Sequence, residues 1–271
     1  MLRLTVDQKI YYTLRLACAM CFIGHGAFGI ITKQIWCNYF AVAGIGRDEA
    51  YTLMPFVGTI DILMGISILV YPTRAIAGWL IIWGMVTASF RPLSGEPFAE
   101  FIERAGNFGA PLVLILIQGG FKIPLKQWFA RMDDHVVVNA ATLKTAVGAL
   151  RILAFLLLLG HGWLNFIEKA GLVNQYHALG FNDPGKTAQI VGVLETAAAF
   201  SILIRPFKNL ILVLAIWKIT SELFYPHYEM FEWIERGGSY GVLLALWLAV
   251  KKAPAGFITF PFRNSHNLRV S

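Results

Sequence analysis

Residues 14–30, LRLACAMCFIGHGAFGI, return in altered form at residues 150–166 as LRILAFLLLLGHGWLNF. The two stretches share a Leu-Arg start and a Gly-His-Gly tripeptide at a constant spacing of 136 residues. Each tripeptide places one histidine, His25 or His161, inside an otherwise apolar run. Glycine weakens a helix, and a buried imidazole needs a hydrogen-bond partner. The two stretches therefore raise the question of what the histidines and their glycines contact.

The composition indicates a membrane protein. Of the 271 residues, 57% are hydrophobic and 14% are charged, whereas a soluble domain carries about 25% charged residues. The apolar residues fall in eight blocks: 10–32, 52–71, 75–93, 106–122, 147–167, 187–204, 208–225 and 238–252. Most blocks approach the ~20 residues that a helix needs to cross a bilayer, and they lack the alternation of barrel strands. The sequence predicts an all-α, polytopic integral membrane protein with eight transmembrane helices.

An internal repeat extends beyond the opening stretches. VGTIDILMGISILVYP (57–72) matches VGVLETAAAFSILIRP (191–206), which aligns Asp61 with Glu195. EFIERAGNFG (100–109) matches EWIERGGSYG (232–241), and Trp83 aligns with Trp217. Four helices per copy bring both copies into the membrane in the same direction. We expect two parallel four-helix repeats, 1–122 and 147–271 with a C-terminal tail, joined by a cytoplasmic linker at 123–146.

The charge distribution predicts the orientation. Both termini, the short turns near residues 72–74 and 205–208, and the linker hold 15 of the 23 Lys and Arg residues but three of the 16 acids. The positive-inside rule makes this side cytoplasmic. The first apolar block is too long for the core of a signal peptide, so we expect it to remain as the first helix. The predicted location is the cell inner membrane, with both termini in the cytoplasm and no nucleic acid as partner.

Each histidine is predicted to lie at a depth in the membrane from which it can pair with an acid. His25 and His161 lie in the outer halves of the first and fifth helices, and Asp61 and Glu195 lie near mid-membrane. An acid at that depth costs roughly 2.5–3.5 kcal/mol on insertion scales, so it needs a partner. We expect His25 to pair with Asp61, and His161 with Glu195.

The histidines allow three interpretations. In the first, each histidine is a buried imidazole bonded to a neighbour, and its glycines permit close helix packing. In the second, the histidine donates to a quinone carbonyl or accepts a proton, and the acid orients it. In the third and least favoured, the two histidines are haem ligands. No zinc-binding spacing is present, so no metal site is expected. Cys18 and Cys21 have the spacing of a redox dithiol, but their counterparts Ala154 and Leu157 favour apolar packing.

Two Glu-Arg pairs precede the fourth and eighth apolar blocks at the predicted outer surface, Glu103-Arg104 and Glu235-Arg236. A Glu at this position interacts favourably with the dipole of the helix that follows, and an Arg anchors the helix end at the membrane interface. Alternatively, the Arg binds an anionic ligand. We expect these groups to face a polar pocket within each four-helix unit. Short surface helices at 33–42 and 169–181 are expected to cap these pockets from outside.

The two predicted pockets differ chemically. Lys218 and Glu222 are one turn apart, as in an internal ion pair, whereas the aligned positions of the first half hold Gly84 and Ala88. The more polar second half is therefore favoured as the working site. Its candidate ligand-binding residues are His161, Glu195, Lys218, Glu222, Arg236 and His227, and those of the first half are His25, Asp61, Arg91 and Arg104.

The order of these motifs resembles the DoxX family of four-helix membrane proteins, with both halves, about 230 residues, covered as two fused copies. The motifs are Leu-Arg then Gly-His-Gly on the first helix, an acid with a terminal Pro on the second, and Arg-x-Gly before the fourth. The resemblance implies a four-helix unit and, for some members, a role in membrane oxidoreductase systems. These include the quinone-linked thiosulfate oxidation attributed to the related DoxD protein.

The sequence thus favours a DoxX-like integral membrane subunit of a redox system. It would bind a quinone or lipid-like ligand, or anchor a membrane oxidoreductase complex, with membrane lipids and other subunits as partners. The alternatives are a transporter for a small molecule and a non-catalytic accessory subunit. Against a transporter, the prolines lie near helix ends instead of breaking helices at mid-membrane.

Overall fold

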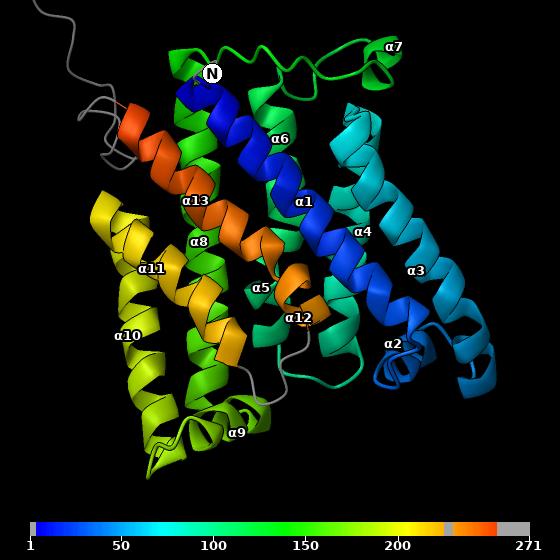
Figure 1. Ribbon diagram of the computed structural model, residues 1–271, viewed down its shortest axis with the longest axis vertical. Helices are drawn as coiled ribbons and strands as arrows, with labels where there is room; N and C mark the ends of the chain where they lie inside the picture. Colours follow the sequence, from blue (N-terminus) through cyan, green and yellow to red (C-terminus); the bar gives the residue numbers. More distant parts are fainter. Residues whose placement is uncertain (1–3, 225–229, 254–271) are drawn as a thin grey trace, which may run out of the picture.

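The computed structural model describes residues 4–224 and 230–253, and within these ranges the chain is helical and forms no β-strand (Figure 1). The all-α prediction is confirmed. The helices are α1 (Val6–Ile30), α2 (Trp36–Val42), α3 (Arg47–Val70), α4 (Arg74–Leu93), α5 (Ala99–Glu103), α6 (Ala105–Ile117), α7 (Leu125–Trp128), α8 (Ala140–Phe166), α9 (Ala170–Ala178), α10 (Pro184–Ile204), α11 (Lys208–Ser221), the 3-10 turn η1 (Glu222–Phe224), α12 (Met230–Glu235) and α13 (Gly237–Lys252).

A helix lies at each of the eight apolar blocks, but the helices differ in length. Within the described ranges, five are long and apolar enough to cross a membrane, namely α1, α3, α4, α8 and α10. The other three, α6, α11 and α13, have 13, 14 and 16 residues. At about 1.5 Å per residue they measure about 20–24 Å, less than the ~30 Å hydrocarbon core. Two of them are short because the helix breaks at Arg104, between α5 and α6, and at Arg236, between α12 and α13.

The helices form a central group and two flanks. Figure 1 shows α1, α6, α8 and α13 in the middle, with α3 and α4 on one side and α10 and α11 on the other. In the 18-residue apolar stretch of each helix, 67% of the residues of α1 and 56% of those of α8 are buried, whereas α3 and α10 each have 28% of theirs buried. The flanking helices present large apolar side chains outward, such as Phe56 on α3 and Leu194 on α10. An apolar outer surface of this kind suits contact with lipid.

Glycine permits close packing between helices of the two halves. A Cβ built at Gly24 would lie 2.4 Å from the backbone nitrogen of Glu235 on α12, and one at Gly160 would lie 2.4 Å from that of Glu103 on α5. The first helix of each half therefore packs against the short helix of the other half. This corrects the expectation that each pocket lies within one four-helix unit. The sequence alone cannot show whether the short helix packs within its own half or against the other half, because both arrangements use the same glycines and apolar faces.

The second glycine of each tripeptide faces the neighbouring helix of its own half. A Cβ at Gly26 would lie 2.5 Å from the carbonyl oxygen of Gly58 on α3, and one at Gly162 would lie 3.0 Å from that of Gly192 on α10. All four tripeptide glycines thus permit close helix approach, as small residues do in membrane bundles.

The repeated arginines secure the ends of two helices. Arg15 Nε donates to the carbonyl oxygen of Ile68 at 3.1 Å, and Arg151 Nε donates to that of Ile202 at 3.3 Å. The last carbonyls of a helix have no partner within the helix. Each Leu-Arg motif therefore caps the second long helix of its own half, a role that the sequence comparison did not assign.

The end of the molecule that carries the N-terminus also holds the linker and the end of α13 (Figure 1). Asp7 Oδ2 accepts from the backbone nitrogen of Val138 at 3.0 Å, and Lys252 Nζ donates to Asp7 Oδ1 at 2.5 Å. The linker also bonds the turn before α4, where Met132 N donates to the Pro72 carbonyl at 2.8 Å. Four segments that the sequence predicts on one side of a membrane thus lie together: the start of α1, the linker, the turn before α4 and the end of α13.

The glycine contact predicts a position-specific effect on stability. Gly160→Ala is expected to lower the free energy of unfolding by about 1–3 kcal/mol, because the added methyl overlaps backbone atoms. The measurement is equilibrium unfolding in mixed micelles. Gly148→Ala is the matched control on the same helix, where an added Cβ meets nothing within 4 Å, so stability should be equal or higher. Equal losses at both positions would contradict the close-contact explanation.

Candidate functional site

Both predicted histidine–acid pairs are formed. His25 Nδ1 lies 2.7 Å from Asp61 Oδ2, and His161 Nδ1 is hydrogen-bonded to Glu195 Oε2. Both acids are buried, with Asp61 fully enclosed. The pairing prediction is confirmed, and each acid near the middle of the bundle has the polar partner that its burial demands.

In the second half, the pair belongs to a closed hydrogen-bond cluster. Trp217 Nε1 donates to Glu195 Oε1 at 3.3 Å, so both oxygens of this carboxylate have partners. Asn165 Nδ2 donates to the His161 carbonyl at 3.1 Å, and Tyr176 OH donates to Asn165 Oδ1 at 2.8 Å. Tyr176 comes from α9, the predicted capping helix. Both oxygens of Glu195 are therefore bonded by side chains of its own half.

In the first half, the corresponding bond is missing. Within the part of the chain that the structure describes, the buried atoms Trp83 Nε1 and Asp61 Oδ1 have no hydrogen-bond partner. These residues align with Trp217 and Glu195, which bond each other. A buried donor or acceptor without a partner costs about 1–3 kcal/mol, so this gap requires an explanation.

A cavity of about 450 Å³ lies in the first half, beside His25. Aromatic rings line much of it: Phe28, Trp36, Tyr39, Phe40, Trp83 and Phe90. Three of these rings come from α2, which covers the cavity as predicted for the 33–42 segment. His25 contacts Trp36, with ring centroids 4.7 Å apart. The volume falls within the roughly 300–1,000 Å³ typical of small-molecule sites.

Charged groups from both halves complete the cavity wall: Lys33, Arg91, Arg104, Lys169, Glu232, Glu235 and Arg236. Five of these seven side chains are cations. Glu232, Glu235 and Arg236 belong to α12 and the following break, which reach the first half through the glycine contact at Gly24. The cavity thus offers hydrogen-bond donors to a ligand from either half of the chain.

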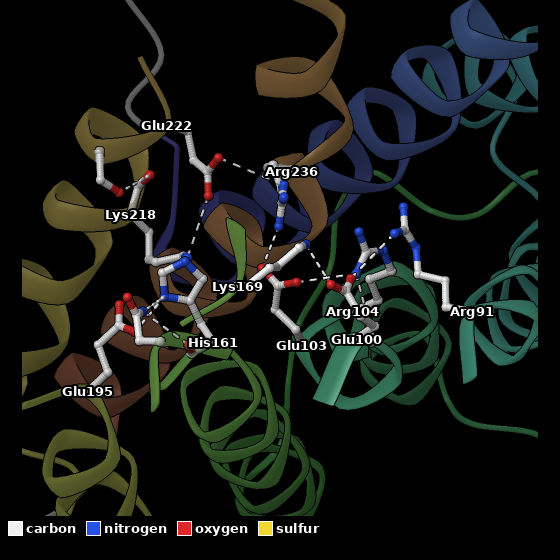
Figure 2. Close-up of polar contacts among 12 residues, drawn as sticks. Arg91, Glu100, Glu103, Arg104, His161, Lys169, Glu195, Lys218, Glu222 and Arg236 are labelled. Carbon is white, nitrogen blue, oxygen red and sulfur yellow. Dashed lines mark hydrogen bonds and ion pairs between the residues drawn. The ribbon is translucent and has the colours of Figure 1, made fainter. Parts of the chain in front are cut away.

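Buried carboxylates hold these cations in a continuous ion-pair network (Figure 2). Glu100 accepts from Arg104 at 2.6 Å and Arg91 at 3.3 Å, and lies 2.5 Å from Lys169 Nζ. Burial raises the pKa of the Glu100 carboxyl, but the neighbouring cations, Arg104 foremost, outweigh it and lower the pKa to about 2. Glu100 is therefore ionised at physiological pH.

The network continues across the molecule into the second half. Glu103 pairs with Arg104 at 3.2 Å and also with Arg236. Arg236 approaches Glu222 at 3.8 Å, and Glu222 approaches Lys218 at 3.5 Å. The predicted Lys218–Glu222 ion pair is confirmed, and Figure 2 shows how Arg236 connects it to Glu103.

The structure places the predicted site residues in two groups. His25, Arg91 and Arg104 line the cavity and Asp61 lies behind His25, whereas the second-half candidates His161, Glu195, Lys218 and Glu222 are absent from its wall. Arg236 contributes to both groups. The sequence favours the second half for its polar residues, but the cavity lies beside His25 in the first. His227 lies outside the described residues.

Some residues of the candidate site were not identified from the sequence. Glu232 and Lys169 lie far along the chain from His25, so no local motif connects them with it. Asn165 does carry a signal, since a polar residue one turn after His161 replaces the Gly29 of the first half. Cys18 and Cys21 are free and buried, consistent with packing. Among the described residues, no group of three or more His, Cys, Asp or Glu could hold a metal ion.

Comparisons with known proteins add no relative: a scan against protein-family models, a search of curated proteins and a search of solved structures each found no match.

The network predicts that removing a buried charge lowers the stability of the protein much more than removing an exposed one. Glu103→Gln is expected to lower the free energy of unfolding by about 3–5 kcal/mol, because it leaves two buried guanidinium groups undercompensated. Arg131→Gln is the control, since Arg131 pairs with Asp134 at 3.0 Å with its side chain 52% exposed, and its loss should cost less than about 1 kcal/mol. Equilibrium unfolding in mixed micelles measures both. Similar small losses would show that the network is energetically dispensable.

Proposed function

We propose that the protein is a multi-pass inner-membrane protein that binds a quinone or lipid-like ligand in the first-half cavity, as the membrane subunit of a redox system. It has eight transmembrane helices, arranged as two parallel DoxX-like repeats, 1–122 and 147–271, around a cytoplasmic linker at 123–146. Both termini are cytoplasmic. Partner subunits supply the electron carriers.

Recurring contacts support the repeat. Three contacts of one half have counterparts at aligned residues of the other: His25–Asp61 with His161–Glu195, Arg15–Ile68 with Arg151–Ile202, and Gly24–Glu235 with Gly160–Glu103. Chance similarity between apolar helices does not reproduce a histidine–acid pair and a carbonyl-capping arginine together. Two of the three shorter helices, α6 and α13, fit as spans because they lie in the protein centre, with their apolar residues largely buried.

The observation that carries the ligand proposal is the aromatic cavity beside a buried histidine–acid pair. A quinone has a flat ring that stacks on aromatic side chains and two carbonyl oxygens that accept hydrogen bonds. The cavity supplies rings such as Trp36 and Phe40, and donors such as Arg91.

The pair supplies proton chemistry. Because Asp61 Oδ2 contacts Nδ1 of His25, the carboxylate favours the tautomer with the proton on Nδ1 and leaves Nε2 for a ligand. Neutral His25 then accepts a proton from a quinol hydroxyl, and protonated His25 donates to a quinone carbonyl. Oxidation of a quinol releases two protons and two electrons. His25 takes one proton, the second proton passes to water, and both electrons pass to a redox group of a partner subunit.

Binding of a quinone analogue to the purified protein tests the proposal. Trp36 and Trp83 line the cavity, so binding of a short-chain benzoquinone should quench part of the tryptophan fluorescence with a micromolar dissociation constant. His25→Gln is expected to weaken binding at least tenfold by removing the proton-exchanging ring nitrogen. Cys18→Ser, on the same helix, should bind like the unaltered protein, because Cys18 is not part of the cavity wall.

The opposite results point to the other function classes. If no quinone binds and none co-purifies, the chain acts as an accessory subunit. If Cys18→Ser removes activity in a reconstituted complex and His25→Gln does not, the dithiol is the working group. Uptake of a small solute by proteoliposomes would favour a transporter.

A further inference from the structure

Three cations of the cavity wall gather around one carboxylate (Figure 2). Glu100 Oε2 accepts from Arg104 at 2.6 Å and from Arg91 at 3.3 Å. Lys169 Nζ lies 2.5 Å from Glu100 Oε1. All three cations line the cavity, whereas Glu100 is buried and is not part of the wall. The three cations therefore lie side by side, and each has both Glu100 and the cavity as a neighbour.

The two guanidinium groups use only part of their hydrogen-bonding capacity. Arg91 donates through Nη1 to Glu96 and Glu100. Arg104 donates through Nη1 to Glu100 and Glu103. Within the described ranges, Nε and Nη2 of both groups donate no hydrogen bond. Arg104 is 8% exposed, and a buried donor without an acceptor is destabilising, so a ligand in the cavity can supply the acceptor that these nitrogens need.

Arg91 is the cation that distinguishes the two halves. Trp83 and Trp217 are aligned, and at the same spacing after them the first half has Arg91 and the second half has Tyr225. Glu100 thus receives a cation that the sequence of the second half does not provide. The additional positive charge lies in the half that contains the cavity.

Two acids of the wall limit where an anion can lie. Glu232 is occupied by Lys33, whose Nζ lies 2.5 Å from its Oε1. Glu235 lies where α12 packs against Gly24, next to His25, and its negative charge would repel an anion. An anion is therefore favoured at the cations around Glu100 and disfavoured beside His25.

We infer that the cavity binds an amphiphile through an anionic head group, a carboxylate or a phosphate, that accepts hydrogen bonds from Arg91, Arg104 and Lys169. Guanidinium groups bind the oxygens of carboxylate and phosphate in pairs, and charge-assisted hydrogen bonds are stronger than neutral ones. The apolar body of the ligand packs on the rings of α2, such as Trp36 and Phe40.

This inference rests on the proposed function, because it uses the same cavity, and it narrows the lipid-like ligand to an anionic one. A neutral quinone offers single carbonyl oxygens and carries no charge to complement the cations. Carboxylate and phosphate head groups present the same kind of acceptor oxygens, so the two need separate probes.

The experiment compares two anions with their neutral analogues: dodecanoate with methyl dodecanoate, and dodecyl phosphate with dodecanol. Dissociation constants come from scintillation proximity binding of each radiolabelled probe to the full-length protein in dodecyl maltoside micelles, with protein-free micelles as the blank. At least one anion should bind tenfold or more tightly than its neutral analogue. The anion with the tighter binding identifies the head group as a carboxylate or a phosphate.

Arg91→Gln is the decisive variant, because it removes the cation that the second half lacks while Glu100 keeps Arg104 and Lys169. The preference for the anion over its neutral analogue should fall at least fivefold. Lys169→Gln should lower it as well, and it tests the inference if Arg91→Gln does not fold, since the Lys169 side chain is 32% exposed. Arg131→Gln is the matched control, because Arg131 lies in the linker and outside the cavity wall, and it should leave the preference intact.

The outcomes separate the inference from the function that it refines. Equal affinity for the anions and their neutral analogues would overturn the anionic site, and so would a preference that persists in both Arg91→Gln and Lys169→Gln. If the benzoquinone binds and neither anion does, the inference fails and the proposed function stands. If the quinone, the anions and the neutral analogues all fail to bind, the proposed function itself fails.

Discussion

The close contact between Gly24 and the backbone of Glu235, with its counterpart between Gly160 and Glu103, is the constraint on which the rest of the structure depends. A side chain at either glycine would overlap backbone atoms, so α1 packs closely against α12, and α8 against α5. This contact brings each Glu-Arg break to the histidine of the opposite half. The polar interior is therefore assembled from both halves and does not form within either one alone.

Because the two Glu-Arg segments lie in the interior of the protein, their buried charges need partners of opposite sign. Glu100 and Glu103 are almost completely buried, and isolated carboxylates there would be very costly. Each instead contacts at least two cations, and Arg236 extends the chain of pairs to Glu222. A network satisfied on all sides is rigid, and removal of one member leaves its neighbours exposed to the low dielectric. The cavity wall is consequently a fixed array of donors.

The sequence predicts those features that depend on spacing along one helix or on alignment between the halves. Apolar block length predicted the five long helices α1, α3, α4, α8 and α10, and the aligned depths of His25 and Asp61 predicted their bond. Features that depend on how helices meet were not predictable. The exchange of α5 and α12 between halves and the helix break at Arg104 both follow from packing in three dimensions, for which a single sequence carries no direct signal.

The choice between the two halves shows why polarity alone misleads. The second half has more polar side chains, and the sequence favours it for that reason. The carboxylates there already have partners within the protein, however: Glu195 is bonded through both oxygens, and Glu222 lies between Lys218 and Arg236. A binding site needs unfilled volume together with polar atoms whose hydrogen bonds are incomplete. Ala88 and Trp83 both line the cavity, and Trp83 Nε1 has no hydrogen-bond partner among the described residues, so the half with fewer polar groups is the one equipped to hold a ligand.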